Sequence, residues 1–329
     1  MILPLWLAII VFLVAIAITI KCGDLFTDGA KGIGLALGVS NIVMGLTLVS
    51  FATTSPEFMV SVMSSASGNS GLAVGNAVGS CICNIGLILA ILGIMKTVPT
   101  TRNVVSQDGV VLVIMGATLF GLSLDRTISR IDGAILVVLF LAYMFFIIRR
   151  FRQAKPKYED GAPHRIFPQE TEARKNLKKN VILFLVGAAG VVGGSRLLII
   201  SGESMARAFG VPDVIIGLTL IAVGTSLPEL VTAIMSVRKG LGDMGVGNVI
   251  GANIWDTAWV VGVSALARPL PIDDQTISLT FPVMLGITVL TLVLLRYRYE
   301  WKRWKGAIIL GCYVAYLVAL LFLWPMISA

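Results

Sequence analysis

The chain has 329 residues, of which 57% are hydrophobic and only 13% are charged. Soluble globular domains carry roughly 25% charged residues, so this composition excludes a soluble domain and favours a bundle of membrane-spanning helices. The formal net charge of +8 does not indicate a nucleic-acid partner, because the basic residues lie in a few short segments between apolar runs.

Apolar runs in chain order predict ten spans, and therefore an all-α polytopic membrane protein. The first run has no basic segment before it, so we expect a retained span and not a signal peptide. Residues 23–38 and 201–210 mix glycine with charges and should continue the first and sixth helices as polar or amphipathic ends. The expected spans are residues 2–22, 41–66, 71–94, 107–124, 130–148, 180–200, 213–237, 243–266, 276–295 and 306–326.

Lysine and arginine predict the orientation of these spans. Residues 149–179 carry ten of them and residues 296–305 carry five more, all on one side if there are ten spans. The positive-inside rule places that side in the cytoplasm of a multi-pass cell-membrane protein, with both termini outside. The segment 149–179 has no apolar periodicity, so we expect a flexible cytoplasmic linker; a regulatory patch or one that binds anionic lipid is the alternative.

An internal repeat is the strongest signal in the sequence. Residues 39–94 align without a gap on residues 211–266, at a constant offset of 172. Five spans separate the second from the seventh, an odd number, so the two copies should cross the membrane in opposite directions. Inverted repeats are typical of alternating-access transporters that bind their substrate near the bilayer midplane. We therefore expect a first five-helix repeat in residues 1–148, the linker, and a second, inverted repeat in residues 180–329.

Each copy of the repeat places a carboxylate, Glu57 or Glu229, inside an apolar helix. Such a group costs about 2.5–3.5 kcal/mol at the bilayer centre, and no lysine or arginine lies at matching depth in these helices. Two acids without basic partners indicate a bound cation; two protonated, hydrogen-bonded glutamates are the structural alternative. Asp256 is a third acid within an apolar run.

The neighbouring residue types favour a hard cation. Pro56 and Pro228 each remove one helical N–H and open the preceding turn, which frees main-chain carbonyl oxygens. Thr53 and Thr225 lie four residues before the glutamates, on the same helix face. Carboxylate, carbonyl and hydroxyl oxygens are the ligands that calcium takes, and no cluster of cysteine and histidine suits a softer metal.

The next helix of each copy supplies a second polar set. Gly75 and Gly79 form a GxxxG motif, as do Gly247 and Gly251, and such motifs permit close backbone approach. Ser80 and Asn84 then lie one turn apart on one face. The repeat equates these two residues with Ala252 and Asp256.

These motifs resemble those of the cation/calcium exchanger superfamily, specifically its sodium/calcium exchanger branch of prokaryotic type. The segment Gly224–Glu229, GTSLPE, is similar to the family motif letter for letter, whereas the first copy reads ATTSPE. The resemblance implies a calcium site between Glu57, Glu229, Thr53 and Thr225. It also implies sodium sites that share the glutamates and use Thr54, Ser80 and Ser226, with Asn84 and Asp256 as further polar groups. Ala252 replaces the serine that the resemblance implies, which removes one hydroxyl from a sodium site.

We predict a secondary antiporter that exchanges Ca²⁺ for Na⁺ by alternating access. Two or three fixed negative charges can balance one calcium ion or several sodium ions but not both loads, since like charges repel strongly at low dielectric. Proton/calcium exchange is the alternative coupling, and a cation channel is the alternative of another class. No nucleophile–base pair or metal-ligand motif indicates an enzyme. We expect no cofactor, no nucleic acid and no obligatory protein partner, with membrane lipid around the bundle.

Overall fold

The computed structural model describes residues 3–153, 168–209 and 222–323. Within them, eight helices are long and apolar enough to cross a membrane, and the bent pair Asn41–Thr53 and Ser55–Ala66 raises the number to nine. The predicted all-helical membrane fold is confirmed, with eight or nine candidate spans among the described residues. The expected span 213–237 lies partly outside the described residues, so the predicted total of ten stays a prediction.

The first half of the chain runs from α1 to α8. Its elements, with η for a π-helix, are α1 (Leu5–Leu37), α2 (Asn41–Met44), η1 (Gly45–Val49), α3 (Ser50–Thr53), α4 (Ser55–Ala66), α5 (Ser70–Cys83), η2 (Asn84–Leu89), α6 (Ala90–Met95), β1 (Val98–Pro99), η3 (Val104–Asp108), α7 (Gly109–Leu122), β2 (Thr127–Ile128) and α8 (Arg130–Gln153).

The second half repeats this order. Its elements are α9 (Pro168–Lys175), α10 (Leu177–Ala208), α12 (Ala222–Thr225), α13 (Leu227–Arg238), α14 (Gly242–Ile254), η5 (Trp255–Val260), α15 (Val261–Ala267), β3 (Leu270–Pro271), η6 (Thr276–Thr280), α16 (Phe281–Arg296), β4 (Glu300–Trp301), α17 (Arg303–Val318) and η7 (Ala319–Leu323).

Helix bounds reproduce the sequence repeat. Both ends of α13 lie 172 residues after those of α4, and both ends of η6 lie 172 residues after those of η3. The short strands follow the same order, because β1 pairs with β4 and β3 pairs with β2, each antiparallel over two residues. The structural correspondence therefore extends past the aligned residues 39–94, to residues 98–108 and their counterparts.

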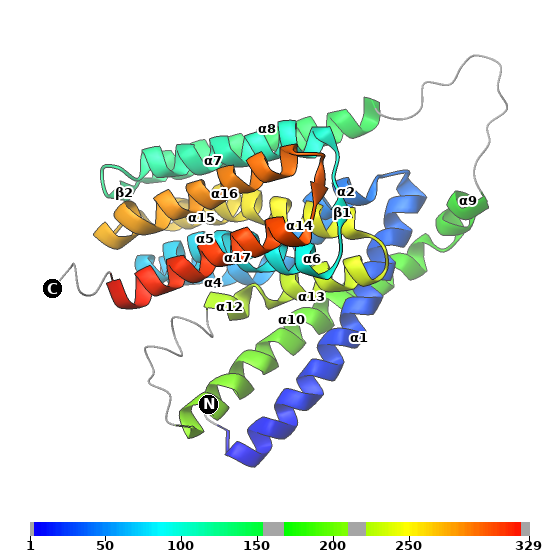
Figure 1. Ribbon diagram of the computed structural model, residues 1–329, viewed down its shortest axis with the longest axis horizontal. Helices are drawn as coiled ribbons and strands as arrows, with labels where there is room; N and C mark the ends of the chain where they lie inside the picture. The colour runs from blue at the N-terminus through cyan, green and yellow to red at the C-terminus, as the bar shows by residue number, and fades with distance from the viewer. Residues whose placement is uncertain (1–2, 154–167, 210–221, 324–329) are drawn as a thin grey trace.

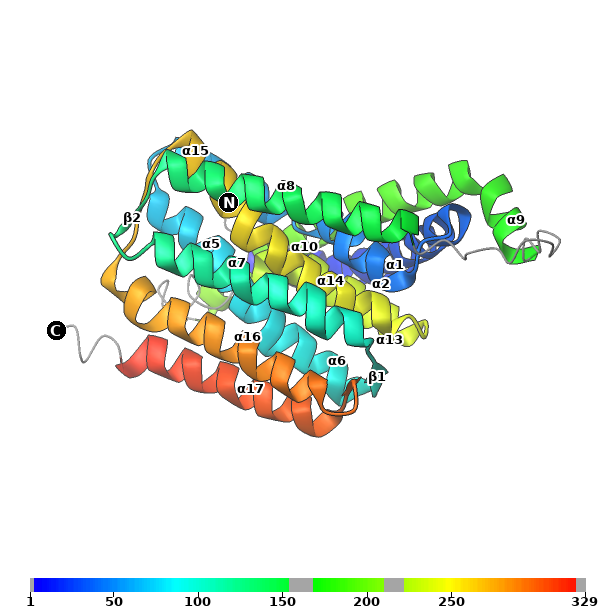
Figure 2. The ribbon, with the colours of Figure 1, turned by 90° about the horizontal axis from the view of Figure 1, so that it is seen from above.

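The helices form a block and a slanted pair. Helices α5–α8 and α14–α17 run side by side in the block, whereas α1 and α10 pack along each other at an angle to it (Figures 1 and 2). Glycines bring the pair close: a Cβ added at Gly29 would lie 2.7 Å from Phe184 Cα, and one at Gly187 would lie 2.6 Å from Phe26 Cα. The predicted continuation of the first and sixth helices is confirmed, since α1 reaches Leu37 and α10 reaches Ala208.

The predicted linker 149–179 is more ordered than expected at both ends. Helix α8 extends to Gln153, α9 occupies Pro168–Lys175, and α10 already begins at Leu177. One reason is a contact that polarity alone does not reveal: Arg174 Nε donates a hydrogen bond to the main-chain oxygen of Ala36, 3.2 Å away at the end of α1. Residues 154–167, including His164, lie outside the described residues.

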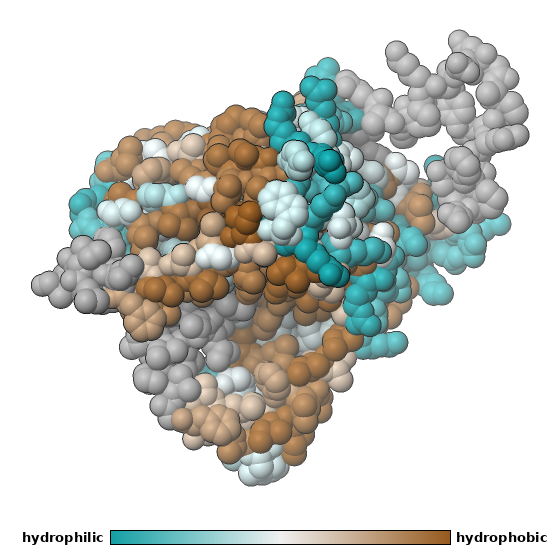
Figure 3. Space-filling model, viewed as in Figure 1, coloured by the Kyte–Doolittle hydropathy of each residue, from teal (hydrophilic) through white to brown (hydrophobic). Residues whose placement is uncertain are grey.

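Polar surface gathers at one end of the block. Hydrophilic residues cover the end that holds β1, β4 and α9, while most of the visible flank is apolar (Figure 3). We call this end the basic end, because the loops with Lys96, Arg102 and residues 296–305 lie there. Strands β2 and β3 mark the opposite end, where α1 begins and η7 ends. The predicted gathering of basic segments on one side is thus confirmed for the described residues.

Candidate ion-binding site

Both intramembrane glutamates follow a break in their helix. Helix α3 ends at Thr53 and α4 begins at Ser55, and the two segments bend by 47°. In the second copy α12 ends at Thr225 and α13 begins at Leu227. A proline stands in the first turn after each break, so the predicted opening of the helix is confirmed. Each glutamate then sits in the first turn of a new helix.

The two carboxylates are buried and largely without partners. Glu57 and Glu229 are each 1% exposed, and neither Glu57 oxygen accepts a hydrogen bond from a described residue. Glu229 Oε1 accepts one from Thr54 Oγ1 at 3.3 Å, while its Oε2 has no described partner. The ion pairs formed among the described residues involve neither glutamate. Since burying an unpaired charge is costly, these oxygens suit a cation as their partner.

The predicted hydroxyl ligands come from both halves of the chain, and Thr54 contacts Glu229 directly. The side chains of Thr53, Thr54, Ser80, Thr225 and Ser226 are all buried. The hydroxyl oxygens of Ser80, on α5, and Thr225, on α12, lie 3.5 Å apart. The structure therefore brings together one predicted hydroxyl ligand from each copy, Ser80 and Thr225.

The amide and the third acid complete the predicted set. Asn84 and Asp256 are each 1% exposed. Asn84 Nδ2 donates to Asn253 Oδ1 at 3.0 Å, and Asn253 Nδ2 donates to the main-chain oxygen of Cys81 at 3.1 Å. Oδ1 of Asn84 and Oδ1 of Asp256 have no described hydrogen-bond partner, which leaves two more buried oxygens for a cation.

Sequence reasoning missed the asparagines that hold the helices in place. Asn248 Oδ1 accepts from Ser50 Oγ and Thr53 Oγ1, both at 3.3 Å, and its Nδ2 donates to Thr232 Oγ1 at 3.2 Å. Its counterpart Asn76 donates to the main-chain oxygen of Glu57 at 3.1 Å. The recurrence of this asparagine in both copies was the available signal. Asn253 gave no such signal, because the repeat equates it with Cys81.

The prediction that the GxxxG motifs permit close backbone approach is confirmed in the second copy. A Cβ added at Gly247 would lie 2.5 Å from the carbonyl oxygen of Ile42, and one at Gly251 would overlap the Ser50 hydroxyl. At Gly75 and Gly79 it would meet no described atom within 4 Å. The repeat places the partners of these two glycines near residues 214–222, which lie mostly outside the described residues. Close approach at Gly75 and Gly79 therefore stays a prediction.

The donor set is mixed. Among the residues that the structure describes, no three histidine, cysteine, aspartate or glutamate side chains are grouped so that they alone could hold a metal ion. Two glutamates with hydroxyl, amide and carbonyl oxygens match the hard, oxygen-preferring cations. The arrangement can therefore hold calcium or sodium between the two halves of the chain.

Comparison with known proteins agrees with this chemistry. The family model described as "Sodium/calcium exchanger protein" matches residues 7–149 and 179–322. A relative from Methanosarcina acetivorans, "Sodium/calcium exchanger MaX1", is 30% identical over 95% of this chain and 98% of its own. The inner membrane protein YrbG of Escherichia coli is 31% identical over 98% and 99% of the two chains. Among solved structures, the sodium-calcium exchanger NCX_Mj superimposes with a TM-score of 0.83 at 28% identity, over 96% of this chain and 100% of that chain.

Proposed function

The chain belongs to the sodium/calcium exchanger protein family, and from this premise we propose that it is a secondary antiporter that exchanges Ca²⁺ for Na⁺ across the cell membrane by alternating access. The observation that carries the proposal is the pair Glu57 and Glu229. They come from opposite halves of the chain, are each 1% exposed, and keep three of their four carboxylate oxygens without a described partner. These unpaired carboxylate oxygens are suited to bind a cation reversibly.

We assign calcium to Glu57 and Glu229 together with Thr53 and Thr225. Sodium ions share the glutamates and use Thr54, Ser80 and Ser226, with Asn84 and Asp256 as further polar groups. The charge balance supports exchange. One calcium ion or two sodium ions neutralise the two glutamates, whereas both loads together would place excess positive charge at low dielectric. The two loads therefore exclude each other.

We infer that the chain consists of two inverted five-helix repeats, residues 1–148 and 180–329, with ten spans in total. The equal offsets of α4 from α13 and of η3 from η6 support the repeat. The positive-inside rule places the basic end in the cytoplasm and both termini outside. The long pair of α1 and α10 is the element that slides against the block, since glycines line their mutual contact and α1 also packs on α13.

Calcium uptake by reconstituted protein tests the function. Proteoliposomes are loaded with sodium and diluted into sodium-free medium containing calcium; a second set carries an outward proton gradient instead. We expect saturable uptake that requires internal sodium. Uptake driven by the proton gradient and indifferent to sodium would establish proton/calcium exchange. Flux that needs no counter-ion and does not saturate would establish a cation channel.

A further inference from the structure

A buried asparagine joins the site helices of the two halves. The side chain of Asn248, on α14, contacts Ser50 and Thr53 of α3 in the first half. It also contacts Thr232 of α13, one turn after Glu229, in the second half. The side chains of these residues are all buried. Asn248 therefore connects the helix break of the first copy to the glutamate helix of the second.

The contact with Thr232 fixes which way the Asn248 amide points. The Thr232 hydroxyl oxygen lies 2.9 Å from the main-chain oxygen of Pro228 and 3.1 Å from that of Glu229. Carbonyl oxygens only accept, so the hydroxyl donates its proton to the main chain. Its oxygen is left to accept a hydrogen bond, and Asn248 Nδ2 supplies that bond at 3.2 Å. The acceptor end of the amide, Oδ1, therefore faces α3.

On α3, Asn248 Oδ1 has two hydroxyl neighbours, Ser50 Oγ and Thr53 Oγ1, both at 3.3 Å. Each hydroxyl has a single proton to donate. The Ser50 hydroxyl has a closer acceptor, the main-chain oxygen of Gly45, at 2.7 Å. The main-chain oxygen of Ser50 lies 3.4 Å from Thr53 Oγ1, slightly farther than Asn248 Oδ1 does. The amide oxygen of Asn248 is therefore left to accept the proton of Thr53.

The direction of that proton matters for ion binding. A hydroxyl group binds a cation through the lone pairs of its oxygen, so its own proton has to point away from the ion. The proposed calcium site groups Thr53 with two carboxylates, which would accept this proton and turn it toward the ion. Asn248 Oδ1 belongs to no proposed ligand and offers the proton another acceptor, at 3.3 Å.

The second copy is arranged differently. The repeat equates Asn248 with Asn76, and Thr53 with Thr225. The amide of Asn76 donates to the main-chain oxygen of Glu57, at 3.1 Å. The neighbour of the Thr225 hydroxyl is another hydroxyl, 3.5 Å away, which can donate as readily as accept. Among the contacts of the described residues, Thr53 is thus the ligand threonine that has an amide oxygen for its proton.

We propose that Asn248 is a positioning residue of the ion site, which accepts the proton of the Thr53 hydroxyl and so turns the lone pairs of Thr53 toward the calcium ion. The proposal rests on the proposed function, which assigns calcium to Thr53 and the glutamates. Asn248 itself does not bind the ion. It ties a ligand of the first half to α14 of the second half, so the orientation of that ligand depends on how the halves are arranged.

Calcium binding to the purified protein in sodium-free detergent solution, measured by titration calorimetry, tests the proposal beside sodium-driven uptake. Asn248→Ala removes the acceptor. We expect its Kd for calcium to rise about threefold to tenfold, as for the loss of one neutral contact, while the maximal uptake rate stays within about twofold. Asn248→Asp keeps an acceptor oxygen whether or not its carboxyl group is ionised, so its Kd should stay at or below the wild-type value.

A double-mutant cycle with Thr53→Val shows whether Asn248 acts through Thr53. Valine removes the hydroxyl and keeps the branched shape. In that background Asn248→Ala should change the Kd less than about twofold, because no hydroxyl remains to be oriented. Val249→Ala is the control for lost volume, since Val249 is the next residue of α14 and is also fully buried. This control should leave the Kd unchanged.

Thr232→Val gives a second test if Asn248→Ala does not fold. It removes the hydroxyl that orients the amide, and we expect the Kd to rise about twofold to threefold, again with no further effect in Thr53→Val. An unchanged Kd in the variant that folds, equal weakening in Asn248→Asp, or effects that add to that of Thr53→Val would overturn the proposal. Wild-type protein that binds calcium but exchanges it for protons would overturn the proposed function alone, and wild-type protein that binds no calcium would overturn both.

Discussion

Thr54 donates a hydrogen bond to the carboxylate of Glu229, with 3.3 Å between Oγ1 and Oε1. The two residues are 175 positions apart and belong to opposite halves of the chain. The contact between Ser80 and Thr225 joins the halves in the same way. Neither half therefore supplies all of the proposed ligands, and in the proposed mechanism a relative movement of the halves changes the set of oxygens that an ion meets. This coupling of site geometry to the arrangement of the halves is what alternating access requires.

Replacing either glutamate by glutamine should abolish calcium transport. Glu57→Gln and Glu229→Gln each remove one of two charges that balance the ion while they keep the side-chain shape. Loss of a buried charge partner is worth about 3–5 kcal/mol, so we expect uptake to fall more than about a hundredfold. Sodium-driven ⁴⁵Ca²⁺ uptake into proteoliposomes measures the effect. Glu203→Gln is the matched control, because Glu203 pairs with Arg207 on the partly exposed surface of α10. Wild-type uptake in both site variants would refute the assignment of the site.

Asp256→Asn should retain exchange. The repeat equates Asp256 with Asn84, so an amide at 256 gives the second copy the group that the first copy already has. Asp256 also has one oxygen without a described partner, and asparagine keeps an acceptor at this position. We expect a maximal rate within about threefold of wild type in the same uptake assay, as for removal of one neutral contact. A complete loss of exchange would mean that the charged carboxylate is required.

The sequence predicted the buried glutamates, the breaks at Pro56 and Pro228, and the continuation of α1 and α10, because each depends on local rules or on the repeat. The roles of Asn248 and Asn253 depend on contacts between segments about 170–200 residues apart, which no local pattern encodes. The helical ends of the predicted linker 149–179 were missed for the same reason, while the flexible linker itself stays a prediction. Its polar residues suggested flexibility, whereas the bond from Arg174 to Ala36 holds α9 beside the end of α1.

Lys239→Gln should loosen α1 without stopping transport. Lys239 Nζ donates to the main-chain oxygen of Asp24 at 2.7 Å and lies 2.7 Å from a carboxylate oxygen of Asp28, so it ties α1 to the end of α13. These groups are partly exposed, and such pairs contribute about 0.2–1 kcal/mol each. We expect twofold to fivefold faster hydrogen exchange in residues 20–37, measured by mass spectrometry. Lys302→Gln, which breaks an ion pair with Glu300 instead, should leave that peptide unchanged. Equal protection of α1 in both variants would contradict the prediction.

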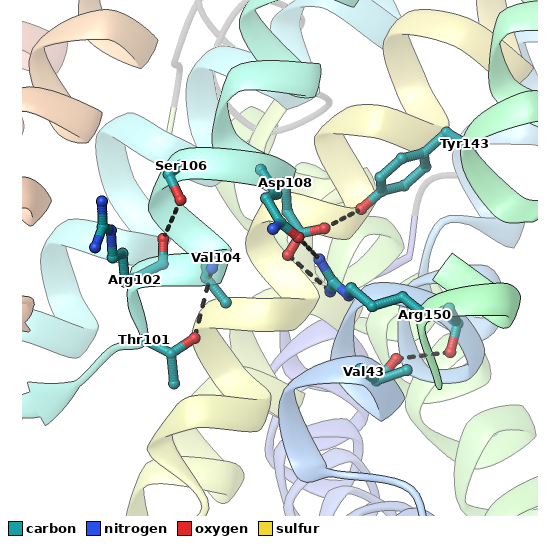
Figure 4. Close-up of polar contacts among 10 residues, drawn as sticks. Val43, Thr101, Arg102, Val104, Ser106, Asp108, Tyr143 and Arg150 are labelled. Carbon is teal, nitrogen blue, oxygen red and sulfur yellow. Dashed lines mark hydrogen bonds and ion pairs between the residues drawn. The ribbon is translucent and has the colours of Figure 1, made fainter. Parts of the chain in front are cut away.

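Arg150→Gln should destabilise the block. Asp108 is fully buried, and Arg150 and Tyr143 bind its two carboxylate oxygens at 3.1 and 3.2 Å (Figure 4). Removing the arginine leaves a buried carboxylate without its charge partner, at a cost of about 3–5 kcal/mol. Thermal unfolding in detergent should show a clearly lowered midpoint, largely restored when Asp108→Asn is added. Arg296→Gln, at an exposed position near the same end, serves as the control. An unchanged midpoint in Arg150→Gln would show that the pair contributes nothing to stability.

Ala252→Ser should strengthen sodium binding. Ala252 is fully buried beside Gly251, and the repeat equates it with Ser80, whose hydroxyl lies 3.5 Å from that of Thr225. The corresponding threonine of the first copy, Thr53, has no such hydroxyl to contact at position 252. It donates to Asn248 Oδ1 instead, at 3.3 Å. One candidate sodium site therefore has an oxygen that its counterpart lacks, and the two copies should bind sodium unequally.

Serine at 252 adds one oxygen to a small side chain, and one such contact is worth about 1 kcal/mol net, or several-fold in affinity. We expect the sodium concentration for half-maximal exchange to fall by about threefold to fivefold, while the half-saturating calcium concentration stays the same, because calcium is assigned to the glutamates and the two threonines. Both constants are measured by titrating each ion in the uptake assay. Ala258→Ser is the control, because Ala258 is another buried alanine, in η5, which directly follows α14. Sodium dependence identical to wild type would mean that a carbonyl oxygen or water already fills the position. Fluxes that respond to pH but not to sodium in both proteins would assign the coupling to protons.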